Sequence, residues 1–297
     1  MKSTIVLAYS GGFASSVAIH WLAESYGAEV VTLTLDVGQG QDVGELRGRA
    51  MSLGAVRAHG IDARDELARR FLPVSPGGGL LGAGLDPRID ELPRPLVARR
   101  LVEVAALEGA RTVAHGGVDA SLDDCIHAID PSLTVVAPAR EWRLSADELA
   151  SYARARGVPA RGPAEAACRV DQNLWGRMVS WPDGAAPPAA VQQRGRAARA
   201  EQARIDIHFE QGVPVSVNGV PMAPAELVES LGLIAGWHGI GRIEMDGGGR
   251  RVVYDAPAAV VLRAALASGA DEGGIVRLAL LNGEYTVLAP DAANLRV

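Results

Sequence analysis

The chain has 297 residues, and its 29 basic and 35 acidic side chains give a formal net charge of −6. The acidic balance argues against a protein built mainly to coat nucleic acid or an anionic membrane, and 48% hydrophobic with 22% charged residues excludes a disordered chain. The two cysteines, Cys125 and Cys168, are too few and too far apart for a disulfide framework, which favours a reducing, cytoplasmic location.

The N-terminal segment predicts a buried strand rather than a targeting signal. The apolar run of residues 4–8 is too short for a signal peptide and leads directly into Ser10-Gly11-Gly12. No apolar stretch approaches the roughly 20 residues of a membrane helix. We therefore expect neither secretion nor a membrane partner.

The first half of the chain alternates strand-like and helix-like segments. After the strand at 4–8, the apolar pattern at 17–22 predicts a helix that ends at Gly27, where glycine suits a left-handed cap. Further strands are predicted at 29–37, 55–61, 112–114 and 134–137, and helices at 43–53, 65–71 and 96–108. This alternation predicts an α/β fold with a doubly wound parallel sheet, whose ligands bind at the carboxyl ends of the strands.

The composition changes after about residue 160. Residues 182–204 combine an Ala/Pro run with four arginines, which predicts an exposed connection that ends in a basic helix or in a plain solvated segment. Strands are predicted at 205–210, 214–217, 241–245 and 251–254, helices at 223–237 and 258–268, and a hairpin at Gly247-Gly248-Gly249. We therefore predict an α/β domain at 1–163 and an α+β domain at 164–297.

The sharpest motif lies between the first strand and the first helix, at Ala8-Tyr9-Ser10-Gly11-Gly12-Phe13-Ala14-Ser15-Ser16. Small residues at this point let backbone N–H groups converge on an anion, and the helix adds its positive N-terminal end. Ser15 and Ser16 add hydroxyl donors. A purely structural turn is the alternative. The motif is not a Walker loop, and residues 38–44 misplace the third glycine of the dinucleotide fingerprint.

The run Val6-Leu7-Ala8-Tyr9-Ser10-Gly11-Gly12 resembles the pyrophosphate-binding loop of the N-type ATP pyrophosphatases, and of the argininosuccinate synthase family in particular. Further segments continue the resemblance in the same order: 33–39, 53–56, 94–98, 114–116, 136–142, 171–177, 212–215, 236–243 and 253–257. The resemblance implies an adenine nucleotide alpha hydrolase-like domain followed by a synthetase domain, which is shortened after residue 257.

Members of that family adenylate citrulline with release of pyrophosphate, and the amine of aspartate then displaces AMP. The resemblance implies ATP and Mg²⁺ as cofactors, an amino acid or amine as the small-molecule substrate, and no nucleic acid partner. It leaves a homo-oligomer open. The nucleotide-binding positions that it implies are Ala8, Tyr9, Ser10, Gly11, Gly12, Ser15, Ser16, Leu35 and Gly116.

The chain departs from the family in both phosphate-contacting loops. In the first loop, Ala14 stands at the position where the family has an acidic residue. An alanine side chain cannot hold magnesium as a carboxylate does. The second loop of the family, H-G-x-T-G-K-G-N-D-Q-V-R, aligns with residues 115–127, where the lysine and two glycines are absent. We expect the carboxylates of this segment, Asp119, Asp123 and Asp124, to repel a free polyphosphate unless a metal bridges them.

The substrate-contacting positions are also changed. Carboxylates stand where the family has a tyrosine and hydroxyl groups, which favours a cationic or amine-bearing substrate over citrulline. The family's aspartate-binding acid falls on Asp123 or Asp124, and its carboxylate-holding arginine falls on Ile126 or His127. The predicted substrate-binding residues are Asp86, Asp90, Glu91, Asp123, Asp124, His127 and Tyr254.

His115, Asp119, Asp123 and His127 lie four residues apart, a spacing that would align metal ligands on one helix face. The simpler interpretation is a loop followed by a helix with Asp123 or Asp124 near its positive end. We therefore predict no protein metal site.

Three functional hypotheses stay open, and the sequence assigns no catalytic residue. The first is an argininosuccinate-synthase-like, ATP-dependent C–N ligase that acts on a substrate other than citrulline, in specialised metabolism. The second is a non-catalytic homologue that binds a nucleotide or metabolite. The third is ATP-independent chemistry by the new carboxylates, Asp123 and Asp124.

Overall fold

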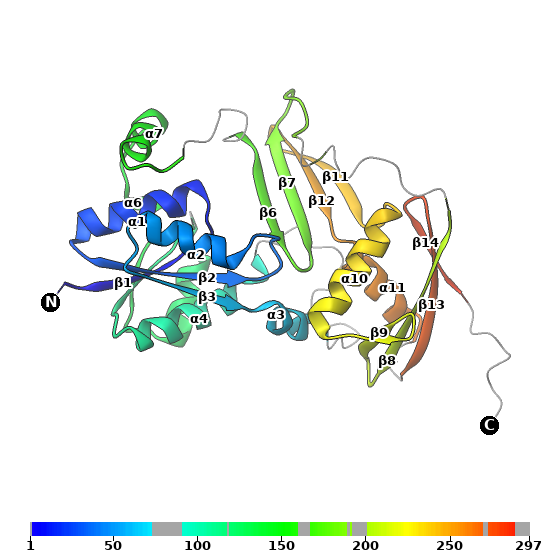
Figure 1. Cartoon of the computed structure of the whole chain (residues 1–297). Coiled ribbons are helices and arrows are strands. Elements are labelled where there is room, and N and C mark those ends of the chain that lie inside the picture. Colours follow the sequence, from blue (N-terminus) through cyan, green and yellow to red (C-terminus); the bar gives the residue numbers. More distant parts are fainter. Residues whose placement is uncertain are drawn as a thin grey trace. The chain divides into compact units, whose positions relative to one another are not determined.

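The computed structural model describes residues 2–72, 91–117, 119–159, 167–188, 191, 201–269 and 273–288. It divides into two compact units, the first formed by Met1–Ala63 with Glu91–Ala164 and the second by Arg64–Asp90 with Glu165–Val297 (Figure 1). The second unit thus includes helix α3 (Arg64–Phe71), which a single division near residue 163 leaves in the first. No helix in the described part of the chain is long and apolar enough to cross a membrane.

The first unit is built on a five-stranded parallel sheet with the order β3-β2-β1-β4-β5. Its strands are β1 (Thr4–Ala8), β2 (Glu29–Asp36), β3 (Arg57–Asp62), β4 (Thr112–Ala114) and β5 (Thr134–Val136). The predicted doubly wound parallel sheet is therefore confirmed. Because the strand order reverses between β1 and β4, the loops that leave these two neighbours flank the crevice where such sheets bind ligands.

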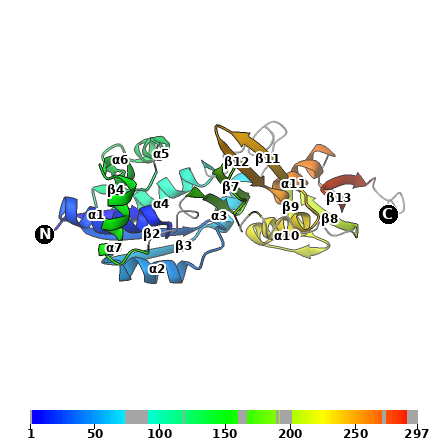
Figure 2. The same ribbon diagram turned by 90° about the horizontal axis from the view of Figure 1, so that it is seen from above.

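Six helices of the first unit are described: α1 (Phe13–Tyr26), α2 (Val43–Ser52), α4 (Arg94–Leu107), α5 (Ser121–Ile129), α6 (Pro138–Glu141) and α7 (Ala146–Ala155). Helices α1 and α2 cover one face of the sheet and α4 covers the other (Figures 1 and 2). As predicted, α1 ends at Gly27, which adopts the left-handed conformation with φ 60°.

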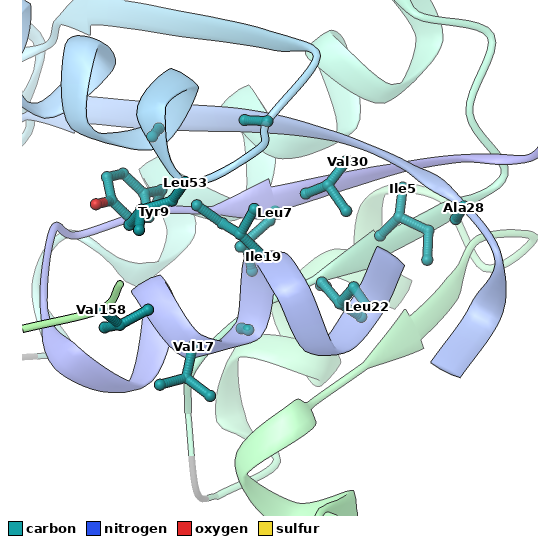
Figure 3. Packing of buried hydrophobic residues seen from close by; sticks show 14 of the residues in the cluster. Ile5, Leu7, Tyr9, Val17, Ile19, Leu22, Ala28, Val30, Leu53 and Val158 are labelled. Carbon is teal, nitrogen blue, oxygen red and sulfur yellow. The ribbon is translucent and has the colours of Figure 1, made fainter. Parts of the chain in front are cut away.

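The core of the first unit fixes where β1 ends. Ile5, Leu7 and Tyr9 point to the α1 face and pack with Ile19 and Leu22 (Figure 3). Val6, which lies between them, is also fully buried and faces the other side, since alternate residues of a strand point to opposite faces. The strand is therefore held on both faces, and the loop that follows it starts from a rigid position.

The second unit is α+β, as predicted, with two antiparallel sheets in the orders β10-β9-β8-β13-β14 and β11-β12-β7-β6. Its helices are α3, α10 (Pro224–Trp237) and α11 (Pro257–Ala267). Its strands are β6 (Arg169–Asn173), β7 (Gly176–Pro182), β8 (Ala203–Glu210), β9 (Val213–Val217), β10 (Val220–Pro221), β11 (Arg242–Gly247), β12 (Arg250–Asp255), β13 (Gly274–Leu281) and β14 (Glu284–Leu288).

The glycine triplet does form a hairpin. Strands β11 and β12 pair in antiparallel fashion, and Gly248 and Gly249 between them have positive φ angles of 56° and 80°. The predicted basic helix near 194–204 falls largely on residues 192–200, outside the described part of the chain. Arg204 is part of β8.

Candidate functional site

The first loop of the site follows β1 and is fixed by hydrogen bonds to β2. The Tyr9 N–H donates to the Leu33 carbonyl at 2.8 Å, and the Thr34 hydroxyl donates to the Tyr9 carbonyl at 3.0 Å. Tyr9 is buried and Ala8 is half-buried, so both residues help to anchor the loop on the sheet. The anion-binding motif predicted from the sequence thus starts directly at the carboxyl end of the central strand.

Position 11 of this loop accepts only glycine. Its φ angle is 71°, in the left-handed region. A Cβ atom at this position would lie 2.2 Å from Cδ2 of Leu46, which belongs to α2. The loop therefore lies directly against α2. This close approach requires a residue without a side chain at position 11.

The serines of the motif brace the loop itself. Ser15 donates its hydroxyl to the Gly12 carbonyl at 3.1 Å and shares a 3.2 Å hydrogen bond with the Ser10 hydroxyl. Ser16 shares a 3.2 Å hydrogen bond with the Tyr9 hydroxyl. Ser15 and Ser16 are buried whereas Ser10 is exposed, so the solvent-facing hydroxyl of the motif is that of Ser10.

A second turn borders the first loop at the carboxyl end of β2. The Gln39 side-chain amide donates to the Leu35 carbonyl at 2.8 Å, and its oxygen accepts from the Val37 N–H at 2.7 Å. Gly38, with φ 87°, completes this closed turn. Leu35, predicted to border the nucleotide, is buried and lies on the strand next to β1.

The loop after β4 is organised around a buried histidine. His115 is 1% exposed, and its Nε2 lies 2.7 Å from Oδ1 of Asp123. The Gly117 N–H donates to Nδ1 of His115 at 3.0 Å. Because Nδ1 accepts a hydrogen bond, the ring proton is on Nε2 and is donated to Asp123. Gly116, a predicted nucleotide-binding position, lies between His115 and Gly117, which these hydrogen bonds hold in place.

Two arginines neutralise the new carboxylates of this loop. Arg140 donates to Oδ2 of Asp123 at 2.6 Å, and Arg94 lies 3.5 Å from Asp119. Arg94 also donates to the Ser121 hydroxyl, which bonds to Asp119 in turn. Each of these two carboxylates therefore has a cation partner in the same unit, which reduces the repulsion of polyphosphate expected from Asp119 and Asp123.

The electrostatics of the loop follow from these contacts. Burial lowers the pKa of His115, and the opposing hydrogen bond to Asp123 does not offset it, so the ring is neutral at pH 7. Burial raises the pKa of Asp123, but hydrogen bonds from Arg140 and His115 outweigh it and the net pKa is lowered. The hydroxyl and N–H of Ser121 lower the pKa of Asp119. Both carboxylates are charged.

Asp123 and Asp124, which the sequence left as alternatives, have different surroundings. Both lie in the first turn of α5, as the simpler interpretation of this segment predicted. Asp123 is turned inward to His115 and Arg140, whereas Asp124 is exposed. His127 is also exposed, and its Nε2 lies 3.2 Å from the Leu133 carbonyl.

The four-residue spacing does not produce one helical face. Helix α5 begins at Ser121, so His115 and Asp119 precede it and only Asp123 and His127 lie on it. Within the described ranges, no group of three His, Cys, Asp or Glu side chains could hold a metal ion.

The structure describes two of the four remaining predicted substrate residues, Glu91 and Tyr254. Asp86 and Asp90 lie outside the described residues. Glu91 lies 3.8 Å from the Arg94 guanidinium, and so joins Asp119 around that cation. Tyr254 belongs to β12 of the second unit, where it is buried and pairs with Ile243 and Met178.

The arginines Arg49, Arg94 and Arg140 were not identified from the sequence as part of the site. Arg94 and Arg140 lie in segments that carry the family resemblance, but their carboxylate partners are 25 and 17 residues away. Arg49 approaches the first loop from α2 and donates to the Gly11 carbonyl at 3.3 Å. Short-range sequence patterns contain no signal for contacts of this kind.

The buried histidine makes stability depend on pH. Because its folded-state pKa lies below the ordinary value of about 6.5, the unfolded chain binds more protons at mildly acidic pH, and stability is lost as the pH falls below about 6.5. We expect the free energy of unfolding, measured with urea at about pH 7.5 and about pH 5.5, to fall less in His115→Asn than in the natural protein. His20, whose pKa burial also lowers, is present in both proteins and cancels. Equal losses would contradict the assignment.

Comparison with known proteins places this site in a family context. Residues 4–159 match the family described as the arginosuccinate synthase N-terminal HUP domain, and residues 169–269 match its C-terminal domain. The chain is 38% identical to argininosuccinate synthase of Streptococcus gordonii over 282 residues, which are 89% of this chain and 70% of the relative. It is 39% identical to the Anoxybacillus flavithermus enzyme over 275 residues, 87% and 68% of the two chains.

Among solved structures, the chain is similar to NAD+ synthetase from Burkholderia pseudomallei, with a TM-score of 0.34 and 20% identity. The similarity covers 55% of this chain and 69% of that chain. A TM-score this low carries no argument about function.

Proposed function

Because the chain belongs to the argininosuccinate synthase family, we propose that it is an ATP-dependent C–N ligase that adenylates an acceptor other than citrulline and joins it to an amine. ATP-dependent ligation is the chemistry of the family. What we add is the change of acceptor away from citrulline.

The geometry of the first loop is the observation that carries the proposal. Gly11 has the left-handed conformation that an anion-binding turn needs, and the loop ends at the N-terminus of the 14-residue helix α1. The loop leaves the central strand at the point where the strand order reverses. Its backbone N–H groups would hold the polyphosphate of ATP and stabilise pyrophosphate as it leaves.

Magnesium does not fit a protein site of the family's kind. Ala14 supplies no side-chain oxygen ligand at the position of the family's acid, and the described part of the chain offers no cluster of metal-binding side chains. Hard cations such as Mg²⁺ take oxygen ligands, often carboxylates. We therefore assign the ion no protein ligand and expect it to enter only as the counterion of ATP.

The second loop supports a changed substrate. The family's carboxylate-holding arginine falls on Ile126, which is fully buried and cannot pair with an anion, or on His127, whose Nε2 lies 3.2 Å from the Leu133 carbonyl. Asp123 is already paired within the protein, whereas Asp124 presents an exposed carboxylate on α5. In this proposal Asp124 orients the attacking amine, and neither Ile126 nor His127 supplies the guanidinium that would hold a substrate carboxylate in two parallel hydrogen bonds.

The test is incubation with Mg-ATP and a panel of amino acids and amines, with pyrophosphate and AMP as the readouts. We expect release of both products with an acceptor and amine other than citrulline and aspartate. No product above the blank with any pair would refute the ligase. Citrulline with aspartate as the best pair would refute the changed substrate.

A second candidate, nucleotide binding without turnover, is favoured by Ala14 together with the absence of the family's lysine from the second loop. If the protein only binds nucleotide, Ala14→Asp restores the loop acid without creating turnover. If the protein is a ligase that lacks only magnesium handling, we expect Ala14→Asp to raise the rate of pyrophosphate release about tenfold or more. Calorimetry with ATP, ADP and AMP, each with and without Mg²⁺, accompanies this comparison, and AMP binding without ATP binding indicates a degenerate site.

ATP-independent chemistry predicts a different outcome. In that case a panel compound is converted to a new product, detected by chromatography, without any nucleotide, and this conversion is lost in Asp123→Asn and Asp124→Asn. Dependence of the activity on ATP excludes this alternative.

A further inference from the structure

We propose that Arg49 is a positioning residue of the phosphate-binding loop, which holds the Gly11 carbonyl so that the Gly12 N–H is presented to a pyrophosphate group. The proposal rests on the proposed binding of nucleotide at this loop. It assigns a role to a side chain of α2, a helix outside the glycine motif itself.

Two side chains of α2 contact the same residue of the loop. Leu46 and Arg49 are three positions apart and so lie on one face of the helix. Leu46 packs into the space that a side chain at Gly11 would occupy, and the Arg49 guanidinium donates to the Gly11 carbonyl at 3.3 Å. The apolar contact sets the distance between helix and loop, and the hydrogen bond sets the orientation of the peptide.

The orientation of this peptide decides where the next N–H group points. In a planar trans peptide the carbonyl and the following N–H point in opposite directions. Because Arg49 holds the Gly11 carbonyl, the Gly12 N–H faces away from α2. Its contact with the Ser10 hydroxyl is long, at 3.4 Å, so this N–H is weakly satisfied and able to bind an anion.

The charge of Arg49 also makes the Gly12 N–H a stronger hydrogen-bond donor. A cationic donor on the carbonyl oxygen polarises the peptide and makes its N–H a stronger donor, since linked hydrogen bonds reinforce one another. Within the described ranges no carboxylate pairs with Arg49, whereas Arg94 and Arg140 are paired with Asp119 and Asp123. Arg49 therefore brings uncompensated positive charge to a site that lacks the family's lysine.

Arg47 provides a matched control on the same helix. It is exposed like Arg49, but its Nε donates to the Ala58 carbonyl at 2.9 Å, and its stem lies against Gly60 of β3. Removal of Arg47 deletes one exposed arginine from α2 without touching the loop.

The experiment measures binding of inorganic pyrophosphate, ATP and AMP by calorimetry in the natural protein and three variants. We expect Arg49→Ala to weaken pyrophosphate and ATP binding about tenfold and AMP binding less than about twofold, because AMP lacks the phosphates that this loop would hold. Arg49→Lys retains charge and a donor, and should recover part of the affinity. Arg47→Ala should bind all three ligands normally.

Several outcomes would overturn the role of Arg49. These are unchanged pyrophosphate binding in Arg49→Ala, an equal loss for AMP, an equal loss in Arg47→Ala, or no binding of pyrophosphate by the natural protein. A general structural defect would lower all affinities together and would not be rescued by lysine. A different result refutes the ligase proposal: the natural protein binds pyrophosphate and ATP, but no substrate pair releases pyrophosphate.

Discussion

Gly11→Ala should abolish pyrophosphate binding and lower the free energy of unfolding by about 2 kcal/mol. The substitution forces a Cβ into a residue with φ 71° and brings it within 2.2 Å of Leu46. Leu46 is buried and has little room to move, so the loop itself must shift away from α2. Urea denaturation and calorimetry with pyrophosphate measure the two effects.

Gly27→Ala is the matched control for this substitution. Gly27 has a similar φ of 60°, but a Cβ there would meet nothing within 4 Å. We expect a loss of about 1 kcal/mol from backbone strain alone and normal pyrophosphate binding. Equal stability losses in the two variants would show that the Leu46 contact is unimportant, and normal binding by Gly11→Ala would refute the phosphate loop.

Asp123→Ala should lower the free energy of unfolding by about 2 kcal/mol. The substitution removes the acceptor of a ring N–H in His115, a side chain that is 1% exposed, and it leaves the Arg140 charge without its carboxylate. A buried donor without a partner has the full cost of its desolvation. Urea denaturation of this variant beside Asp124→Ala measures the difference.

Asp124→Ala should leave stability nearly unchanged but weaken the binding of the amine substrate. Its side chain is exposed on α5, and we expect a change in stability within about 0.5 kcal/mol. If it orients the amine, its removal raises KM for the amine substrate about tenfold or more, whereas stability is unaffected. A large stability loss in Asp124→Ala, or none in Asp123→Ala, would reverse the roles assigned to the two carboxylates.

The architecture of the first unit could be predicted because its strands are short, apolar and separated by strong breakers. Residues 4–8 and 112–114 were predicted with the bounds that the structure gives to β1 and β4. Helix α1 was recognised from its apolar pattern and from Gly27. These signals are local, so no tertiary contact had to be known.

Two hairpins of the second unit were missed although their turns are visible in the sequence. Strands β13 and β14 are joined by Asn282-Gly283, both with positive φ, which is the strongest short hairpin signal. Strands β6 and β7 are joined at a turn where the Asn173 side chain accepts the Trp175 N–H at 2.8 Å. Strand β6, Arg-Val-Asp-Gln-Asn, is too polar to be recognised by hydrophobicity.

The candidate site was predicted less completely than the fold. The motif around Gly11 is contiguous, and its conformation follows from residue type. The acidic segment at 119–124 looked repulsive because the sequence does not show that Arg94 and Arg140 meet Asp119 and Asp123. Ion pairs between separate elements depend on how helices pack, and residue spacing carries no information about them.

The two loops of the site are attached to different parts of the scaffold. Side chains of α2 hold the loop after β1, whereas Arg94 of α4 and Arg140 of α6 hold the loop after β4. In the proposed ligase, residues 115–127 could therefore change together with their two arginine anchors without altering the contacts that hold the proposed pyrophosphate-binding loop. Natural divergence and laboratory grafting would then act on the same segment to change the acceptor while the activating chemistry is kept.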